Sequence, residues 1–135
     1  MFDLEKNEIK FLYNSNSLSD KEAYGYVLTL ENYKINELDI YKNDLTPTQL
    51  SELAKKMNVK VIDLFDEKSD FFKENIKGKD ISDHDLLDIL VEEKSALKTP
   101  ILITNSSVKV IEYAREIISM DLAFKETKFK DELNK

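Results

Sequence analysis

The sequence predicts an α/β fold in which one four-stranded mixed sheet is flanked by helices. A strand–helix–strand pattern fills the first third of the chain, helix-like segments occupy its middle, and two short apolar runs joined by a polar turn follow. Strands linked through a helix run parallel, whereas strands linked by a tight turn run antiparallel. The sheet should therefore contain both kinds of pairing.

The first strand is expected over Glu8–Tyr13, where apolar residues alternate along the chain. A helix should follow from Ser19 or Asp20 to about Leu30, with Ser19 as its cap and Glu22 as the capping-box partner. Gly25 lies inside this helix at a cost of about 1 kcal/mol relative to alanine. That cost suggests that a neighbouring element packs closely against the helix there.

The second strand is expected over Lys34–Tyr41, parallel to the first and reached by a right-handed crossover. The next helix has the clearest start in the chain. Thr46 is its cap, Pro47 takes the first helical position, and Gln49 completes the capping box.

The middle of the chain reads as three short helical segments. They are a turn or short helix over Val59–Phe65, a helix over Ser69–Ile76 that ends near Gly78, and a helix over Ile81–Glu93 capped by Ser82.

A β-hairpin should follow, with its strands over Thr99–Thr104 and Val108–Ile111. A last helix is expected over Tyr113–Phe124. Residues 1–124 are expected to form a single domain, and residues 125–135 a charged C-terminal tail.

Composition limits the classes of function. The net charge is −7 and Arg115 is the single arginine, so direct nucleic-acid binding is not expected. The chain has no cysteine, which rules out disulfides, thiolate metal sites and thiol nucleophiles. No apolar run is long enough to span a membrane, and the start is too charged for a signal peptide. We therefore expect a cytoplasmic protein with no membrane partner and no cofactor.

Four stretches, in order and with matching gaps, resemble the arsenate-reductase-like family of the thioredoxin-like fold, which also contains the Spx transcriptional regulators. Together they span about residues 9–120, and they read FLYNSNSLSDKEA, NDLTPTQLSELAKKM, VIDLFDEKSDFFKEN and ISDHDLLDILVEEKSALKTPILI. The resemblance implies the same strand and helix order, and a cis peptide bond between Thr99 and Pro100.

The resemblance also locates what this chain lacks. The position of the family's catalytic cysteine is Leu18, and that of the second cysteine of redox-switch members is Lys21. The middle motif, where reductases carry an oxyanion-binding arginine, reads Leu64–Glu67 and is acidic. Thr99 replaces the arginine that normally precedes the proline. Since arsenate reduction needs a low-pKa thiolate and cationic groups for the oxyanion, we expect no reductase activity.

The junction between the first strand and helix is still a candidate ligand site, because backbone N–H groups and the helix dipole favour an anion there. The alternative is ordinary loop chemistry, in which short polar side chains satisfy local backbone groups. The candidate ligand-binding residues are Asn14, Ser15, Ser17, Ser19, Lys21, Thr99 and Pro100.

Two charged clusters are expected to be solvated surface. His84 lies among Asp80, Asp83 and Asp85 at a helix start, where acidic side chains complement the dipole, so no metal site is expected. The second cluster is an acidic patch formed by Asp63, Asp66, Glu67 and Asp70.

The leading expectation is a catalytically degenerate family member that works by binding, with another protein as its partner. By resemblance, Spx-type members act by contacting RNA polymerase. The alternatives are a small-anion or thiol-ligand binder, or a thiol-independent enzyme, using the loop before the first helix. A self-associating structural protein is a further alternative, and the oligomeric state stays open.

Overall fold

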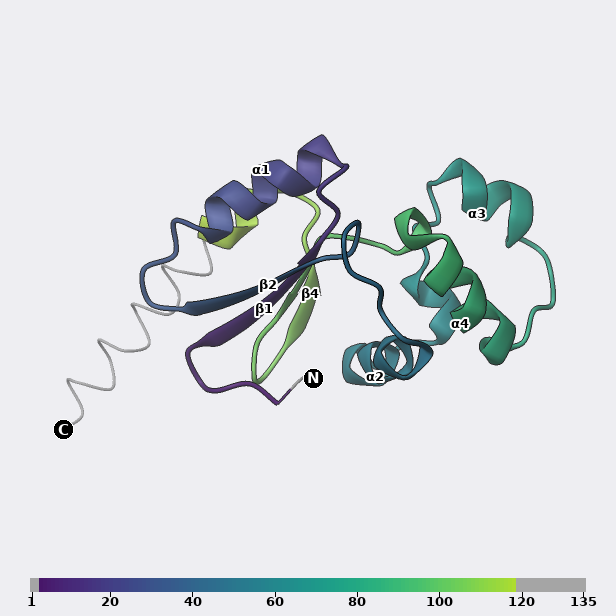
Figure 1. The fold of residues 1–135 in the computed structure, drawn as a ribbon, viewed down its shortest axis with the longest axis horizontal. Helices are drawn as coiled ribbons and strands as arrows, with labels where there is room; N and C mark the ends of the chain where they lie inside the picture. The colour runs from purple at the N-terminus through teal and green to yellow at the C-terminus, as the bar shows by residue number, and fades with distance from the viewer. Residues whose placement is uncertain (1–2, 119–135) are drawn as a thin grey trace.

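The computed structural model describes residues 3–118. It consists of a small sheet with helices on both sides (Figure 1). In chain order the elements are β1 (Glu8–Tyr13), α1 (Leu18–Val27), β2 (Lys34–Asp39), α2 (Pro47–Met57), the 3₁₀ turn η1 (Val61–Leu64), α3 (Asp70–Asn75), α4 (Asp83–Glu92), the 3₁₀ turn η2 (Lys94–Ala96), β3 (Ile101–Ile103) and β4 (Val108–Val110).

The sheet is four-stranded and mixed, in the order β2-β1-β3-β4. β1 pairs with β2 in parallel and with β3 antiparallel, and β3 pairs with β4 antiparallel. Leu12 in β1 lies opposite Leu38 in β2 and Ile101 in β3. The predicted combination of a parallel unit and a hairpin is therefore confirmed.

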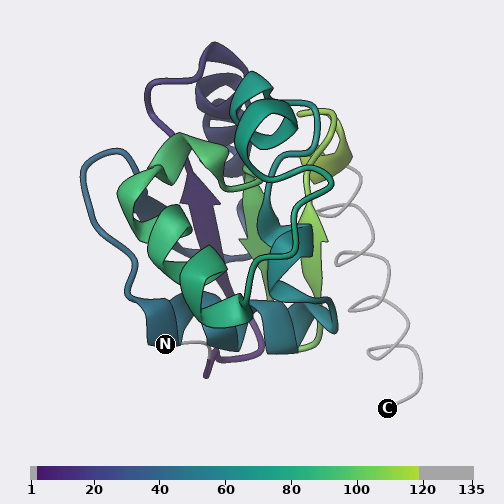
Figure 2. The ribbon, with the colours of Figure 1, turned by 90° about the vertical axis from the view of Figure 1, so that its right-hand side faces the viewer.

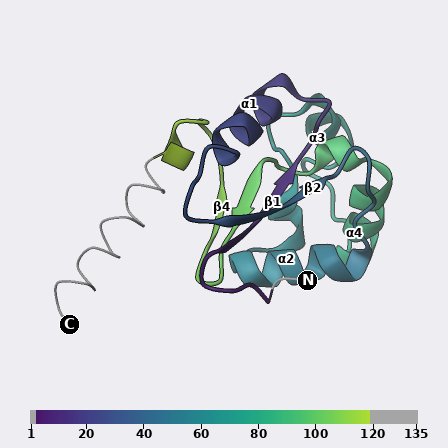
Figure 3. The ribbon, with the colours of Figure 1, turned by 60° about the vertical axis from the view of Figure 1, so that its left-hand side comes forward.

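The alternation along β1 divides the core into two layers. Ile9, Phe11 and Tyr13 pack with α1 on one face, whereas Leu12 faces the opposite core, which α2, α4 and the 3₁₀ turns supply. Figure 2 views the molecule from the side of α2, α3 and α4, and Figure 3 shows α1 and α2 on opposite sides of the sheet. β1 is thus covered on both faces, as expected for a central strand.

The caps of α2 and α4 were predicted correctly, at Thr46 and Ser82. The Thr46 hydroxyl accepts a hydrogen bond from the Gln49 N–H at 3.1 Å, and the Gln49 side chain accepts one from the Thr46 N–H at 3.0 Å. Ser69 caps α3 and Ser82 caps α4.

The start of α1 differs from the prediction. Ser17, not Ser19, is the cap, because its backbone is extended and its hydroxyl accepts a hydrogen bond from the Asp20 N–H at 3.3 Å. Helix α1 therefore begins at Leu18. It ends at Val27, three residues before the predicted end, in turns that continue to Leu30.

The packing expectation for Gly25 was also wrong. A methyl group added there would meet no atom within 4 Å, so this side of α1 faces open space. Gly78, by contrast, has φ of +77°, a conformation that suits glycine.

The C-terminal predictions can be followed only to Ile118. Residues 116–118 are helical, and the rest of the helix expected over Tyr113–Phe124 lies outside the described residues, as does the expected tail. Within residues 3–118, no helix has the length and apolar character needed to cross a bilayer.

Candidate functional site

The loop between β1 and α1 is held by two buried carboxylates. Asp20 and Asp39 are both buried, with exposed fractions of 3% and 7%. The Asn14 N–H donates to Asp20 Oδ2 at 2.8 Å, and the N–H groups of Ser15 and Tyr41 both donate to Asp39 Oδ1 at 3.0 Å. The loop thus already contains the kind of anion that its amides would otherwise attract from solution.

The remaining amides of the loop are also paired within the chain. The Asn16 N–H donates to the Asn14 side chain at 2.9 Å, and the Ser17 N–H donates to the Asn14 carbonyl at 3.0 Å. An external anion at Asn14 or Ser15 would have to displace a buried carboxylate, and leaving that carboxylate unpaired is costly. This arrangement favours the loop-chemistry interpretation of these residues.

The pKa of Asp39 favours the charged form of its carboxyl group. Burial alone would raise the pKa of this carboxyl, but the hydrogen bonds from Ser15 and Tyr41 and the charge of Lys42 lower it below its ordinary value. Asp39 is therefore ionised at neutral pH.

Aromatic stacking holds α1 over the sheet just below this loop. The rings of Tyr13 and Tyr24 are stacked with centroids 4.6 Å apart, and Phe11 stacks on both. The Tyr24 hydroxyl donates to Glu37 in β2, and this hydrogen bond, with burial, raises the pKa of Tyr24 to about 12.

The residue that the sequence resemblance places at the cysteine position is exposed to solvent. Leu18 is the first residue of α1 and is 86% exposed, so its side chain does not fill a groove. Lys21, at the position of the second cysteine, is also exposed.

Next to this loop lies an open groove of about 800 Å³. Figure 1 shows α1, β4 and the chain leading into α3, the elements that bound it. Its walls are one side of α1, the turn before α3, the segment Lys98–Pro100 and the segment Val110–Arg115.

The structure separates the predicted ligand-binding residues into two groups. Ser19, Thr99 and Pro100 line the groove. The other four, Asn14, Ser15, Ser17 and Lys21, do not line it.

The floor of the groove is formed around a cis peptide bond between Thr99 and Pro100, as the resemblance implied. The Lys98 N–H donates to the Leu64 carbonyl at 2.8 Å, and the Pro100 carbonyl accepts from the Ile111 N–H at 2.9 Å. Between these anchors, the backbone N–H and C=O of Thr99 have no hydrogen-bond partner among residues 3–118. Thr99 is half-buried and is one of the residues that line the groove.

The charges in the groove are mixed, and sequence reasoning found only some of them. Asp66 and Glu67 of the predicted acidic patch line the groove, and so do Glu22 and Glu112. Asp63 instead accepts a hydrogen bond from the Lys60 N–H, and Asp70 lies in the first turn of α3.

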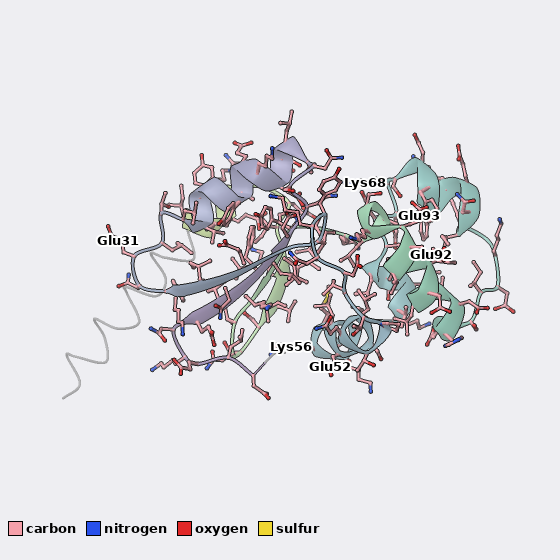
Figure 4. The ribbon with its side chains drawn as sticks, in the orientation of Figure 1. Glu31, Glu52, Lys56, Lys68, Glu92 and Glu93 are labelled. Atoms are coloured by element: carbon pink, nitrogen blue, oxygen red, sulfur yellow. The ribbon has the colours of Figure 1, made fainter. Side chains whose placement is uncertain are left out.

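Three cations in the groove were missed: Lys68, Lys98 and Arg115. None of them forms an ion pair with a carboxylate of the described residues, although the Arg115 guanidinium lies 5.8 Å from the centre of the Tyr113 ring. Figure 4 labels Lys68, in the chain that leads into α3. The sequence motifs could have pointed to two of the three cations. Lys68 directly follows Glu67 of the middle motif, and Lys98 directly precedes Thr99.

The histidine cluster is a surface feature of α4. His84 Nε2 lies 3.6 Å from Asp88 Oδ2, one helical turn away, and Asp85 is close to both. All three side chains are exposed, so no buried ligand set is formed there.

No family model matches the chain, and no curated protein matches it by sequence. Solved structures do match. An arsenate reductase from Vibrio cholerae superimposes with a TM-score of 0.71 at 14% identity, covering 85% of this chain and 98% of the reductase. A Yersinia pestis protein named for the same activity gives a TM-score of 0.71 at 14% identity, covering 82% of this chain and 98% of its own.

A Staphylococcus aureus protein, SACOL0876, solved by NMR, has a TM-score of 0.62 at 18% identity, covering 80% of this chain and 95% of its own. At such identities the likeness establishes the fold and leaves the chemistry open. The resemblance seen in the sequence motifs is confirmed at that level: the described chain has the thioredoxin-like fold of the arsenate reductases.

Proposed function

We propose that this protein is a catalytically silent member of the arsenate-reductase-like group, which binds a segment of another protein in the groove beside Pro100. One observation carries the proposal: the N–H groups of Asn14 and Ser15 are taken by the buried carboxylates of Asp20 and Asp39, while the adjacent groove stays open. A regulatory role of the Spx type and a cytoplasmic location are the finer parts of this proposal.

The argument against reductase chemistry rests on the nucleophile and on the charge around it. Attack on arsenic needs a thiolate, and the chain has no cysteine. Leu18 offers no group that a general base could activate. In the loop before it, the N–H groups of Asn14 and Ser15 are paired with carboxylates, which repel an oxyanion.

The argument for peptide binding rests on the groove. Its volume falls within the range of about 300–1,000 Å³ that ligand sites occupy. The backbone N–H and C=O of Thr99 have no partner in the described part of the chain, and extended peptides dock through such main-chain groups.

Affinity capture from the native host tests the proposal. The unmodified chain is compared as bait with a Ser19→Arg variant, which places a long side chain in the groove. The control carries Thr48→Arg, because Thr48 is likewise exposed and is likewise the second residue of its helix. A reproducible partner that is lost with Ser19→Arg and kept with Thr48→Arg supports the proposal. Thiol-independent turnover of an oxyanion by the purified protein would contradict it.

A second candidate function is the binding of a free anion or a thiol ligand such as glutathione. The observation that favours it is the set of three cations in the groove, Lys68, Lys98 and Arg115, which form no ion pair with any residue from 3 to 118. Thermal-shift measurements with phosphate, arsenate and glutathione test it, and a rise in Tm that Lys98→Gln abolishes would support it.

A further inference from the structure

The segment that follows β4 forms one wall of the groove, and two apolar side chains fix its ends. Ile111 and Ile117 are 6% and 0% exposed, and both pack in the core layer that contains α1. Between these two anchors the chain carries Tyr113 and Arg115, which line the groove. We call residues 111–117 the strap.

Apolar packing does not fix the middle of the strap. Glu112, Tyr113 and Arg115 are exposed, and Ala114 is half-buried. This part of the strap closes on itself in a single turn, in which the Glu116 N–H donates to the Tyr113 carbonyl at 3.0 Å. A single helical turn is marginal on its own, because fixing its backbone is unfavourable. A contact from outside the turn is therefore needed to hold it in one place.

The Glu116 side chain supplies that contact. Its Oε1 accepts a hydrogen bond from the Tyr113 N–H at 3.2 Å, and its Oε2 lies 3.0 Å from Nζ of Lys109 in β4. Oε2 is shielded from water, and the Glu116 side chain as a whole is 22% exposed. Water and salt screen such a partly buried ion pair less than a fully exposed one. The carboxylate thus ties the turn of the strap to a strand at the edge of the sheet.

The ion pair lies outside the groove, since neither Lys109 nor Glu116 lines it. The interaction with Lys109 lowers the pKa of Glu116 below its ordinary value, against the opposing effect of burial. Glu116 is therefore charged at neutral pH. Any effect of the pair on a bound ligand would act through Tyr113 and Arg115, which the strap presents to the groove.

We propose that the ion pair between Lys109 and Glu116 is a latch that sets the position of this groove wall, which makes both of them positioning residues for binding. This inference rests on the proposed function, but it does not depend on the chemistry of the partner. When the latch is broken, Ile111 and Ile117 still anchor the ends of the strap, and the turn that carries Tyr113 opens more often.

Hydrogen exchange at single amides of the full chain, followed by NMR, tests the latch. Lys109→Gln removes the charge but leaves each strap amide and its acceptor in place. Faster exchange of the Glu116 and Ile117 N–H groups would therefore report opening of the turn. We expect exchange about fivefold faster, the upper end of what a partly exposed ion pair contributes, with a nearly unchanged Tm.

Two matched variants define the cause. Lys109→Arg keeps the positive charge and should exchange as the unmodified chain does. Lys94→Gln breaks another ion pair, in which Lys94 Nζ lies 2.5 Å from Asp44 Oδ1, away from the groove. This second variant should leave the exchange of the strap amides unchanged. Equal exchange in Lys109→Gln and the unmodified chain, or equal increases in Lys109→Gln and Lys94→Gln, would overturn the latch.

The consequence for binding is measured with the partner captured from the native host. Lys109→Gln should retain less of that partner than the unmodified chain, whereas Lys109→Arg and Lys94→Gln should retain as much. If exchange rises in Lys109→Gln and the partner is retained in full, the latch does not position the binding groups, and this inference fails while the proposed function stands. If none of the chains captures a partner, the proposed function fails and the binding role of the latch fails with it, whereas the exchange result still decides whether the wall is latched.

Discussion

The loop Asn14–Ser17 and the groove floor Lys98–Pro100 differ in how many of their polar groups have a partner within the described chain. In the loop, each backbone N–H is paired within the chain, with two buried carboxylates taking the donors of Asn14 and Ser15. In the floor, the Thr99 backbone and the Lys98 ammonium have no partner among the described residues. Paired buried groups stabilise a structure, whereas unpaired groups at a concave surface are available to a ligand.

The largest effect is expected where the loop is broken. Asp39→Ala removes the acceptor of two backbone N–H groups, those of Ser15 and Tyr41, and leaves them unsatisfied. Such a loss costs about 1–3 kcal/mol for a buried group, and because both of these bonds are only partly buried, the free energy of unfolding should fall by roughly 1–3 kcal/mol. Urea denaturation measures it. The control is Asp88→Ala, an exposed carboxylate on α4, which should change stability by less than about 0.5 kcal/mol.

The charge of Asp39 gives a second, smaller effect that depends on pH. Its pKa is lowered in the folded state, so it contributes stability above the unfolded pKa of about 3.9 and loses it as pH falls through the folded pKa. Between about pH 5 and pH 3, the unmodified chain should therefore lose more stability than Asp39→Asn, which binds no proton in this range. Parallel loss in the two proteins would show that Asp39 is not held as an anion.

Helix α1 lies between the two regions, and its exposed side allows a change that touches neither. Gly25 is helical and has open space where a Cβ would be, so Gly25→Ala should stabilise the chain by about 0.5–1 kcal/mol. Thermal unfolding followed by circular dichroism would show a higher Tm. No gain would mean that this side of α1 packs against something after all.

Local patterns were enough to predict most of the fold. The alternation in β1, the Thr46–Gln49 capping box and the two apolar runs of the hairpin each act within a few residues, and each is in the structure. The start of α1 was misplaced because Ser17 and Ser19 both have an acidic residue three positions on, at Asp20 and Glu22. Only the backbone conformation of Ser17 decides between them.

The site was less predictable because it depends on contacts between distant segments. Asp39 meets Ser15 across 24 positions of the chain, and no local motif marks that pairing. Lys98 and Arg115 line the same groove as α1 only because β3 pairs with β1 and β4 pairs with β3. The sequence showed which chemistry was missing at Leu18, but it did not show which groups had taken the place of that chemistry.

The smallest effect on stability is expected at the groove floor, and it completes the comparison with the loop. Lys98→Ala removes a side chain that makes no ion pair within the described residues, so the free energy of unfolding should change by less than about 0.5 kcal/mol. The backbone bond from the Lys98 N–H to the Leu64 carbonyl is kept in the variant. Urea denaturation alongside Asp39→Ala measures both regions under the same conditions. A loss at Lys98 as large as that at Asp39 would mean that the lysine holds the fold together and is not free for a partner, and the groove would then lose its central binding group.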